Sequence, residues 1–234
     1  MDKIYGRKAV LETIDAGLTI HKAYIVRQKS HLIDKIIDKL NRAKVDIKFV
    51  DKDFFDKVDI NHQGVMIEVD SFKYKDLNDI GDAKRIILLD QIEDPHNLGA
   101  IIRSAESFGF DAVIISERRS AKVTPTVYKT SAGAINNIDL VMVKNLNRTI
   151  EAVKKDGFWV YGLAGEADSR LSDTDLTGKV ALVVGNEGDG ISRLSREKCD
   201  MLVKIPMTGR VNSLNASVAS AISMYEVLRQ NGFN

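Results

Sequence analysis

The stretch Asp94-Pro95-His96-Asn97-Leu98-Gly99-Ala100-Ile101-Ile102-Arg103 decides how this sequence folds, and two later strings complete the pattern. The second string is Val184-Gly185-Asn186-Glu187-Gly188. The third runs from Ile205-Pro206-Met207 to Ser213-Leu214-Asn215-Ala216-Ser217. Each string comes after an apolar run with the length of a buried strand. We call them motifs one, two and three.

Strands and helices alternate around the three motifs. The apolar runs predict strands at residues 86–89, 112–115, 140–143, 159–163, 181–184 and 202–205, and helices at about 98–108, 147–155 and 214–229. Mostly apolar strands separated by helices indicate a parallel sheet covered on both faces. Neither Gly-x-Gly-x-x-Gly nor Gly-Lys-Ser/Thr occurs in the sequence. We therefore expect an α/β fold that is not an ordinary nucleotide-binding one.

The first 70 residues read as an α/β unit of their own. Helices are expected at 7–16 and 31–43, a short helix through Phe54 and Phe55, and strands at 22–26, 47–50 and 65–69. Residues 71–83 are mostly charged and polar, which is typical of a linker or a short amphipathic connector. The predicted domains are therefore 1–70 and 84–234, joined by the linker 71–83.

Composition limits the classes of protein that remain. The chain has 234 residues, of which 44% are hydrophobic and 29% charged, enough for one large or two modest domains. No run approaches the ~18 apolar residues of a membrane span, and the start of the chain lacks a signal-peptide stretch, so we expect a cytoplasmic protein. The net charge of +1 means that any basic surface is local, and Arg118, Arg119 and Lys122 are candidates for it.

Cysteine and histidine usage argues against metal chemistry. The single cysteine, Cys199, excludes an internal disulfide and a cysteine-based zinc cluster. His21, His31 and His62 are scattered without the spacing of metal ligands. We predict no metal and no membrane partner.

Motif one offers a polar helix start and an arginine. Asn97 follows a strand and is placed to cap a helix beginning at Leu98. Arg103 stays protonated, with a pKa above about 12, so it suits a two-bond clamp on a phosphate better than proton transfer. The plainer alternatives are that Asn97 is only a cap and Arg103 only a partner for Glu106 or a nearby Asp.

Motif two is a glycine-rich turn after a strand. The missing Cβ of Gly185 would let a ligand approach the backbone closely, although a plain tight turn explains the glycines equally well. Glu187 is a solvated turn charge, a group that orients Asn97 or Arg103, or a proton acceptor. Of the functional alternatives we rank orientation first.

Motif three combines a rigid apolar segment with a helix start. Pro206 fixes the chain, so Ile205 and Met207 form an apolar wall for a ligand or pack in the core. Ser213 is a natural N-cap, and free amides at a helix start also favour an anion. Small residues beside the apolar stripe of the last helix permit close packing, which suits a second subunit as well as a core.

Together and in this order, the three motifs resemble the signature motifs of the SpoU/TrmH family of RNA ribose 2'-O-methyltransferases, within the SPOUT superfamily. The resemblance implies methyl transfer from S-adenosylmethionine to a ribose 2'-hydroxyl, a trefoil knot in the C-terminal domain, and a homodimer formed through the motif-one helix and the last helix. Carried over by position, it implies that the catalytic residues are Asn97, Arg103, Glu187, Ser213 and Asn215. It implies that the cofactor-binding residues are Gly185, Asn186, Ile205, Met207 and Leu214. His96 lies inside motif one, but the family accepts several residues there, so we assign it no general-base role.

The N-terminal strings Tyr5-Gly6-Arg7-Lys8-Ala9-Val10 and His62-Gln63-Gly64-Val65 carry a second resemblance. They are similar to the substrate-binding domain, itself like RNA-binding ribosomal proteins, of the subgroup that modifies a guanosine in large-subunit ribosomal RNA. We therefore expect a 23S ribosomal RNA 2'-O-methyltransferase. The alternatives are a transfer RNA methyltransferase and a non-catalytic RNA-binding or assembly factor that has kept the fold.

Overall fold

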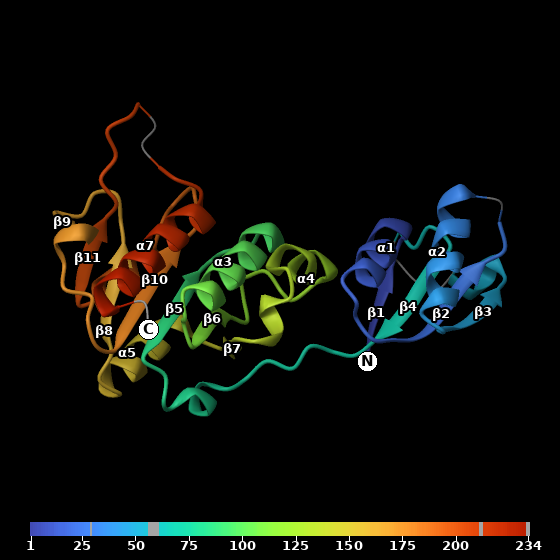
Figure 1. The fold of residues 1–234 in the computed structure, drawn as a ribbon, viewed down its shortest axis with the longest axis horizontal. Coiled ribbons are helices and arrows are strands. Elements are labelled where there is room, and N and C mark those ends of the chain that lie inside the picture. Colours follow the sequence, from blue (N-terminus) through green and yellow to red (C-terminus); the bar gives the residue numbers. More distant parts are fainter. Residues whose placement is uncertain (29, 56–60, 211–212, 233–234) are drawn as a thin grey trace. The chain divides into compact units, whose positions relative to one another are not determined.

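The computed structural model describes residues 1–28, 30–55, 61–210 and 213–232. The chain forms two compact units. Unit 1 consists of Met1–Lys73 and Val123–Lys129, and unit 2 of Tyr74–Lys122 and Thr130–Asn234. Figure 1 shows unit 1 with its helices and sheet in blue and cyan, and unit 2 from green to red. All three motifs lie in unit 2, and we describe each unit by itself.

Unit 1 is a mixed sheet with two helices on one face. Its elements are β1 (Asp2–Tyr5), α1 (Arg7–Asp15), β2 (Ile20–Val26), α2 (His31–Arg42), β3 (Asp46–Val50), the 3-10 turn η1 (Lys52–Phe55) and β4 (Val65–Val69). The strand order is β1-β4-β2-β3, with β4 antiparallel to β1 and β2, and β2 parallel to β3. Val10 of α1 and Ile33, Ile36 and Leu40 of α2 are buried against the sheet. The helical spacing of these apolar side chains in α2 is what packs it there.

The two strings that mark the N-terminal resemblance meet in space. The Oε1 atom of Gln63 accepts a hydrogen bond from the backbone N–H of Arg7 at 3.0 Å, and the Gln63 carbonyl accepts one from Arg7 Nε at 3.1 Å. Gly64 has φ +77°, and a Cβ there would lie 2.2 Å from Nε2 of Gln28. These residues therefore fix the junction between β4 and the start of α1.

Unit 2 is built on a seven-stranded parallel sheet. The strands are β5 (Arg85–Asp90), β6 (Ala112–Ser116), β7 (Asp139–Val143), β8 (Trp159–Leu163), β9 (Ser169–Arg170), β10 (Val180–Gly185) and β11 (Met201–Lys204). Their order is β7-β6-β5-β10-β8-β11-β9, and every pairing is parallel. The carboxyl ends of all seven strands therefore share one edge of the sheet.

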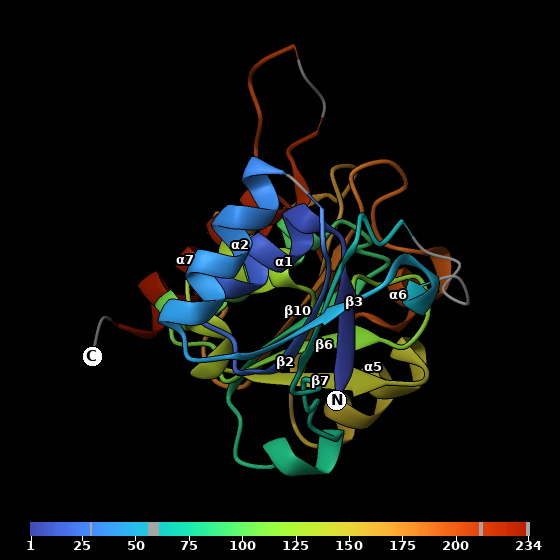
Figure 2. The same ribbon diagram turned by 90° about the vertical axis from the view of Figure 1, so that its right-hand side faces the viewer.

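Helices cover both faces of this sheet, as the sequence predicts. These helices are α3 (Pro95–Ser107), α5 (Leu146–Lys155), α6 (Arg193–Lys198) and α7 (Ala216–Asn231), with the 3-10 turns η3 (Ala134–Asn136) and η4 (Leu171–Asp173). Most of the helix α4 (Pro125–Ser131) belongs to unit 1. Figure 1 shows α3 and α7 side by side, and Figure 2 shows α7 and α5 on opposite sides of the sheet. Ile150 and Val153 of α5 pack against Leu88 and Val183 of the sheet, all of them almost fully buried.

Part of the polar stretch 71–83 packs in unit 2. Leu77–Ile80 form the 3-10 turn η2, and Leu77, Ile80 and Ala83 join the core on the α5 face. Lys75 makes an isolated parallel bridge with Val141 of β7. The trefoil knot of the C-terminal domain remains an expectation from the family resemblance.

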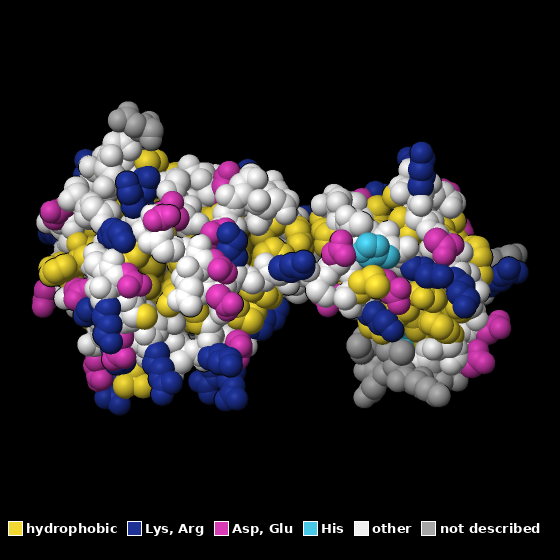
Figure 3. Space-filling model, turned by 90° about the horizontal axis from the view of Figure 1, so that it is seen from below, with side chains coloured by type: hydrophobic (Ala, Val, Ile, Leu, Met, Phe, Trp, Pro, Cys, Tyr) yellow, Lys and Arg dark blue, Asp and Glu magenta, His cyan; other side chains and the backbone are white. Residues whose placement is uncertain are grey.

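The surface carries charges of both signs. Figure 3 shows Lys and Arg side chains interspersed with Asp and Glu on the visible face of each unit, in keeping with the net charge of +1. Within the described ranges, the structure contains no helix long and apolar enough to cross a membrane.

Candidate active site

The candidate site lies at the carboxyl ends of β5 and β10. These two strands are neighbours, and Asp90 at the end of β5 is paired in register with Gly185 at the end of β10. Motif one follows β5, and motif two begins with the last two residues of β10, so the sheet places the two motifs side by side. This edge is where parallel α/β sheets bind their ligands.

Asn97, Glu187 and Asn215 form a hydrogen-bond network that joins the three motifs. The Nδ2 atom of Asn97 donates to Oε1 of Glu187 at 2.5 Å. The Nδ2 atom of Asn215 donates to Oδ1 of Asn97 at 2.9 Å and to the same Glu187 oxygen at 3.2 Å. Glu187 is 90 residues from Asn97 along the chain, so only the fold brings these groups together.

The prediction that Asn97 caps its helix is wrong. The cap is Asp94, whose Oδ1 atom accepts from the backbone N–H of His96 at 3.0 Å. Pro95 occupies the first helical turn, where its missing N–H costs nothing, and the helix therefore starts before Leu98. Asn97 is buried within that first turn, and its amide is free to bind Glu187.

The prediction that Ser213 caps the last helix is also wrong. Asn215 is the N-cap of α7, and its Oδ1 atom accepts from the backbone N–H groups of Ser217 at 2.9 Å and Val218 at 3.3 Å. Asn215 thus satisfies the helix start with its oxygen and joins the network with its nitrogen. Ser213 is exposed in the segment before α7, on the wall of the cavity described below.

Gly185 is needed for the turn itself. A Cβ at this position would lie 1.9 Å from the carbonyl oxygen of Gly190 and 2.3 Å from the nitrogen of Ile191. The space that we assigned to an approaching ligand is therefore filled by the backbone of the same turn. Asn186 closes this turn, since its Oδ1 atom accepts from the N–H groups of Gly188 at 2.9 Å and Asp189 at 2.8 Å.

A cavity of about 850 Å³ opens beside the network. Its wall includes all five residues predicted to bind the cofactor, together with two of the predicted catalytic residues: Gly185, Asn186, Ile205, Met207, Leu214, Glu187 and Ser213. The β8 end contributes Leu163, and the following segment contributes Ala164 and Gly165. Motifs two and three thus supply most of the wall, and motif one does not line it.

The cavity wall also contains charged residues that lie outside the three motifs: Glu166, Arg170, Asp189, Arg196 and Lys204. Arg196 forms an ion pair with Glu166. Arg196 also donates from Nε to the carbonyl of Ile191 at 2.8 Å, which braces the chain after the motif-two turn. Glu166 follows the carboxyl end of β8. This position after a predicted strand is the one sequence feature that could have marked Glu166 as a residue of the site.

Arg103 is not part of this arrangement. It is exposed on α3, and its side chain has no hydrogen bond or ion pair with any residue in the described part of the chain. It lies six residues after Asn97, which at 3.6 residues per turn turns its side chain about 120° away from that of Asn97. The structure therefore brings together four of the five predicted catalytic residues near one cavity and leaves Arg103 outside.

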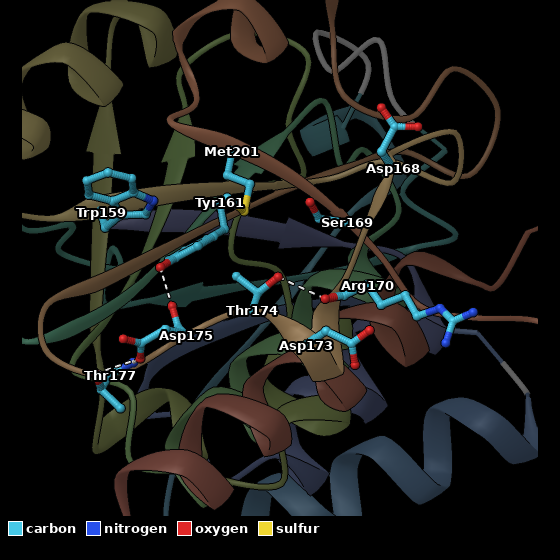
Figure 4. Close-up of a pocket in the computed structure, with 10 residues that line it drawn as sticks. All are labelled: Trp159, Tyr161, Asp168, Ser169, Arg170, Asp173, Thr174, Asp175, Thr177 and Met201. Carbon is cyan, nitrogen blue, oxygen red and sulfur yellow. Dashed lines mark hydrogen bonds between the residues drawn. The ribbon is translucent and has the colours of Figure 1, made fainter.

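A second cavity, of about 600 Å³, lies elsewhere on the sheet. Figure 4 shows Trp159, Tyr161 and Met201 on one side of it and the Asp173–Thr177 segment opposite. The Tyr161 hydroxyl donates to the Asp175 carbonyl at 2.5 Å. No residue that the sequence marks as functional lines this cavity, so we place the active site at the first one.

The residues that the structure describes include no group of three or more His, Cys, Asp or Glu that could hold a metal ion.

The comparisons with known proteins show which family the chain belongs to. Residues 84–225 match the model of the SpoU rRNA Methylase family, and residues 3–75 match a model described as RNA 2'-O ribose methyltransferase substrate binding. The matched region of the first model holds all three motifs. The chain belongs to the SpoU rRNA methylase family.

Curated relatives are similar over the whole chain. A protein of Staphylococcus saprophyticus named as a TrmH family tRNA/rRNA methyltransferase is 41% identical over 98% of this chain and 96% of its own length. A protein of the same name from Bacillus subtilis is 38% identical over 98% of this chain and 96% of its own. An uncharacterized tRNA/rRNA methyltransferase of Synechocystis is 40% identical, but this chain spans only 64% of its length.

Solved structures show the same fold. The SpoU methyltransferase AviRb of Streptomyces viridochromogenes, solved with AdoMet, aligns with a TM-score of 0.67 and 25% identity over 97% of this chain and 89% of that one. A TrmH/SpoU tRNA modifying enzyme of A. aeolicus aligns with a TM-score of 0.58 and 30% identity over 64% of this chain and 78% of that one.

Proposed function

We propose that this protein transfers a methyl group from S-adenosylmethionine to a ribose 2'-hydroxyl of RNA. The observation that carries the proposal is the Asn97–Glu187–Asn215 network beside a cavity walled by motifs two and three. At about 850 Å³, the cavity falls in the range of about 300–1,000 Å³ that small-molecule sites occupy. The family membership supports the same reaction.

The wall of the cavity fits a nucleoside-like cofactor. Ile205, Met207 and Leu214 offer apolar surface for a flat base, and the motif-two turn offers polar backbone groups. S-adenosylmethionine supplies a sulfonium methyl group as the electrophile. The remaining task of the protein is to hold and orient the RNA hydroxyl that receives it.

Glu187 orients the amide groups around the reacting centre. Its Oε1 atom accepts hydrogen bonds from the side chains of Asn97 and Asn215, which fixes both amides against rotation. Such a preorganised set of polar groups stabilises developing charge without reorganising during the reaction. The proton of the 2'-hydroxyl passes to a phosphate of the RNA or to a carboxylate.

Arg103 acts across a homodimer in this proposal. Its guanidinium binds the phosphate beside the target ribose through two parallel hydrogen bonds. Because α3 turns Arg103 away from Asn97, a partner subunit supplies it to the site. The exposed apolar face of α7 supports the dimer: Val218, Ile222 and Tyr225 are 45%, 40% and 46% exposed at helical spacing.

The RNA is ribosomal in this proposal, with a guanosine of 23S ribosomal RNA as the target. Residues 1–70 choose the RNA, the linker 71–83 joins the domains, and residues 84–234 perform the chemistry in the cytoplasm. The match of residues 3–75 to a substrate-binding model supports this division. Transfer RNA is the second candidate, favoured by the similarity to the A. aeolicus tRNA modifying enzyme.

The decisive experiment is methylation of RNA from a strain that lacks the gene. The protein is incubated with radiolabelled S-adenosylmethionine and total RNA, and the labelled nucleotide is mapped. Label at a ribose 2'-oxygen of 23S ribosomal RNA is expected, and label on transfer RNA would replace that target. Cofactor binding without any transfer to RNA would indicate a binding or assembly factor.

A further inference from the structure

The loop between β6 and α4 displays two arginines beside motif one, and no step of the proposed reaction uses them. Arg118 and Arg119 are exposed, and neither guanidinium has a hydrogen bond or ion pair with the described residues. The loop, residues 116–122, carries three cations and one carboxylate, that of Glu117. We call it the arginine loop.

Internal hydrogen bonds hold the arginine loop in one shape. The Nζ atom of Lys122 donates to the carbonyl of Glu117 at 2.7 Å and to that of Ser116 at 3.2 Å. The Ser116 hydroxyl donates to the Arg118 carbonyl at 2.5 Å and lies 2.9 Å from the hydroxyl of Ser120. The Lys122 ammonium group therefore stabilises the loop itself. Of the three cations in the loop, the two arginines remain available to bind a ligand.

The loop is also fastened to the loop that leads into motif one. The backbone N–H of the buried Ala121 donates to the carbonyl of Ile92 at 2.8 Å. Ile92 lies between β5 and α3, and β5 is the strand next to β6. Adjacent strands lie about 5 Å apart, so the arginine loop leaves the sheet one strand spacing from the point where the chain leaves β5 towards motif one.

Both loops contain a strained residue at this junction. Arg119 has φ +52° and Gln91 has φ +61°, values that residues other than glycine adopt at a cost. Such conformations persist where the surroundings enforce them, and they concentrate at functional sites. Here the hydrogen bonds of Lys122 and Ala121 enforce them, so the fold holds the backbone of Arg118 and Arg119 in place while their side chains extend into solvent.

We infer that Arg118 and Arg119 bind backbone phosphates of the RNA strand that flanks the ribose to be methylated. Exposed guanidiniums match phosphate geometry through paired hydrogen bonds, and phosphate contacts fix the register of a nucleic acid on a protein. The two side chains lie at the sheet edge that carries the network, one strand over from motif one. The inference rests on the proposed function, since it takes the substrate to be RNA.

The test is the salt dependence of RNA binding by the full-length protein. Binding of a fluorescently labelled single-stranded oligoribonucleotide is followed by anisotropy over a salt series, without cofactor. Each lost phosphate contact is expected to lower the slope of log affinity against log salt by about 0.7. This corresponds to roughly fourfold weaker binding per arginine near physiological salt. The Arg118→Ala and Arg119→Ala variants should each show this loss, and the double variant about twice the change in slope.

Matched controls separate a local contact from a general loss of charge. Lys84 and Lys155 are exposed at the opposite, amino-terminal edge of the sheet, so the double variant Lys84→Ala/Lys155→Ala removes the same charge there. It should keep the wild-type slope, and an equal decrease would overturn the inference. Arg118→Lys/Arg119→Lys keeps both charges and should keep most of the slope. Arg119→Gly removes the guanidinium while relieving the left-handed backbone, so it tests the contact in a variant that folds readily.

The experiments distinguish a failure of the proposed phosphate contacts from a failure of the proposed methyl transfer. Titration with S-adenosylmethionine should give wild-type affinity for every variant, because the loop does not line the cavity. An unchanged slope and affinity in Arg118→Ala/Arg119→Ala would overturn the inference even if the protein methylates RNA. Wild-type protein that binds RNA with the expected slope but transfers no methyl group would instead contradict the proposed function.

Discussion

Glu187 connects all three motifs through a single oxygen atom. Its Oε1 atom accepts from Nδ2 of Asn97 at 2.5 Å, from Nδ2 of Asn215 at 3.2 Å and from the backbone N–H of Ala216 at 3.4 Å. Two of these donors are side-chain amides whose oxygens are also bonded, since Oδ1 of Asn215 caps α7 and Oδ1 of Asn97 accepts from Asn215. The carboxylate binds the nitrogen of each amide and so helps to set their orientation, and its charge strengthens each bond.

Substitution of Glu187 separates orientation from proton transfer. Glu187→Gln keeps an oxygen that accepts the same bonds, so we expect near-normal stability and a modest loss of turnover. A general base would instead cost about 10²–10⁴-fold in rate when removed. Glu187→Ala leaves the Nδ2 group of the buried Asn97 without its partner and should destabilise the protein by about 1–3 kcal/mol. Single-turnover rates and thermal unfolding of both variants decide between the roles.

Cys199 is partly buried, and this suppresses ionisation of its thiol. Desolvation raises the pKa of the Cys199 thiol from 9.0 to about 12. The Sγ atom also donates to the Ser195 carbonyl at 3.2 Å. The native protein should therefore react with thiol reagents at pH 8 much more slowly than the unfolded chain does.

The raised pKa of Cys199 also predicts how the stability of the protein changes at high pH. Because the folded pKa lies above the unfolded one, the contribution of Cys199 is fully present below about pH 9 and is lost as the pH rises towards 12. The variant Cys199→Ala should remove this part of the alkaline destabilisation. Denaturant unfolding at several pH values checks it, and an identical pH dependence in the variant would contradict the assignment.

At the scale of elements, the motif-two turn is the piece with least tolerance for change. Gly185→Ala would place a Cβ 1.9 Å from the Gly190 carbonyl oxygen, and backbone on both sides leaves it no room. Overpacking of this kind typically costs about 1–3 kcal/mol or more. We expect a clear fall in thermal stability and loss of cofactor binding.

Gly188 provides the control for that substitution in the same turn. A Cβ at Gly188 would meet only the Oδ1 atom of Asn186, at 3.4 Å, and its φ is not positive. Gly188→Ala should therefore retain stability. Equal behaviour of the two variants in calorimetry would show that the turn rearranges and that the close packing at Gly185 is not required.

Elements with strong apolar patterns could be predicted from the sequence, and short or polar ones could not. The helix expected at residues 31–43 is confirmed as α2, and the strands expected around residues 86–89 and 181–184 are confirmed as β5 and β10. The helix α6 and the strand β9 escaped prediction because they have six and two residues, too few to show a period.

The errors within the site come from caps, which depend on one or two residues. Asp94 and Asn97 are both good N-cap residues, and the sequence alone does not show which one the helix uses. The proline at position 95 was the signal that favoured Asp94. The contact between Asn97 and Glu187 could not be predicted from local patterns. It forms only because β5 and β10 are neighbours in the sheet, and no local sequence pattern encodes that strand pairing.

At the scale of the whole molecule, the separation of Arg103 from the network argues for a dimer. Asn97 faces the core of unit 2, and Arg103 faces solvent from the same helix. The helix α7, packed beside α3, presents Val218 and Ile222 to solvent, each at least 40% exposed. A second copy on this face would cover apolar surface and bring its own Arg103 to the site.

Disruption of the exposed apolar face of α7 should abolish turnover and leave cofactor binding intact. Ile222→Glu places a charge in the proposed interface, and burial of an unpaired charge is strongly unfavourable, so we expect a monomer. The cavity does not include Ile222, and S-adenosylmethionine affinity should persist. Light scattering reports the oligomeric state, and a dimeric, fully active Ile222→Glu protein would contradict the placement of the interface.

Mixed dimers test the shared site directly. Arg103→Ala alone should lose about 10²–10³-fold in turnover, the usual cost of one preorganised polar contact at the reacting centre, while cofactor affinity holds. Glu187→Ala should also lose turnover, because it removes the acceptor of the Asn97 and Asn215 amides.

If each site takes Asn97 and Glu187 from one subunit and Arg103 from the other, a dimer of one Arg103→Ala chain and one Glu187→Ala chain contains one intact site and one doubly altered site. Co-expression of the two chains with different affinity tags, followed by tandem purification and single-turnover methylation, should then restore a large part of the rate of one wild-type site. Arg103→Lys serves as the comparison, because its ammonium lacks the two-bond fork and should recover little activity in either partner. No recovery in the purified mixed dimer would place all the catalytic residues in one subunit.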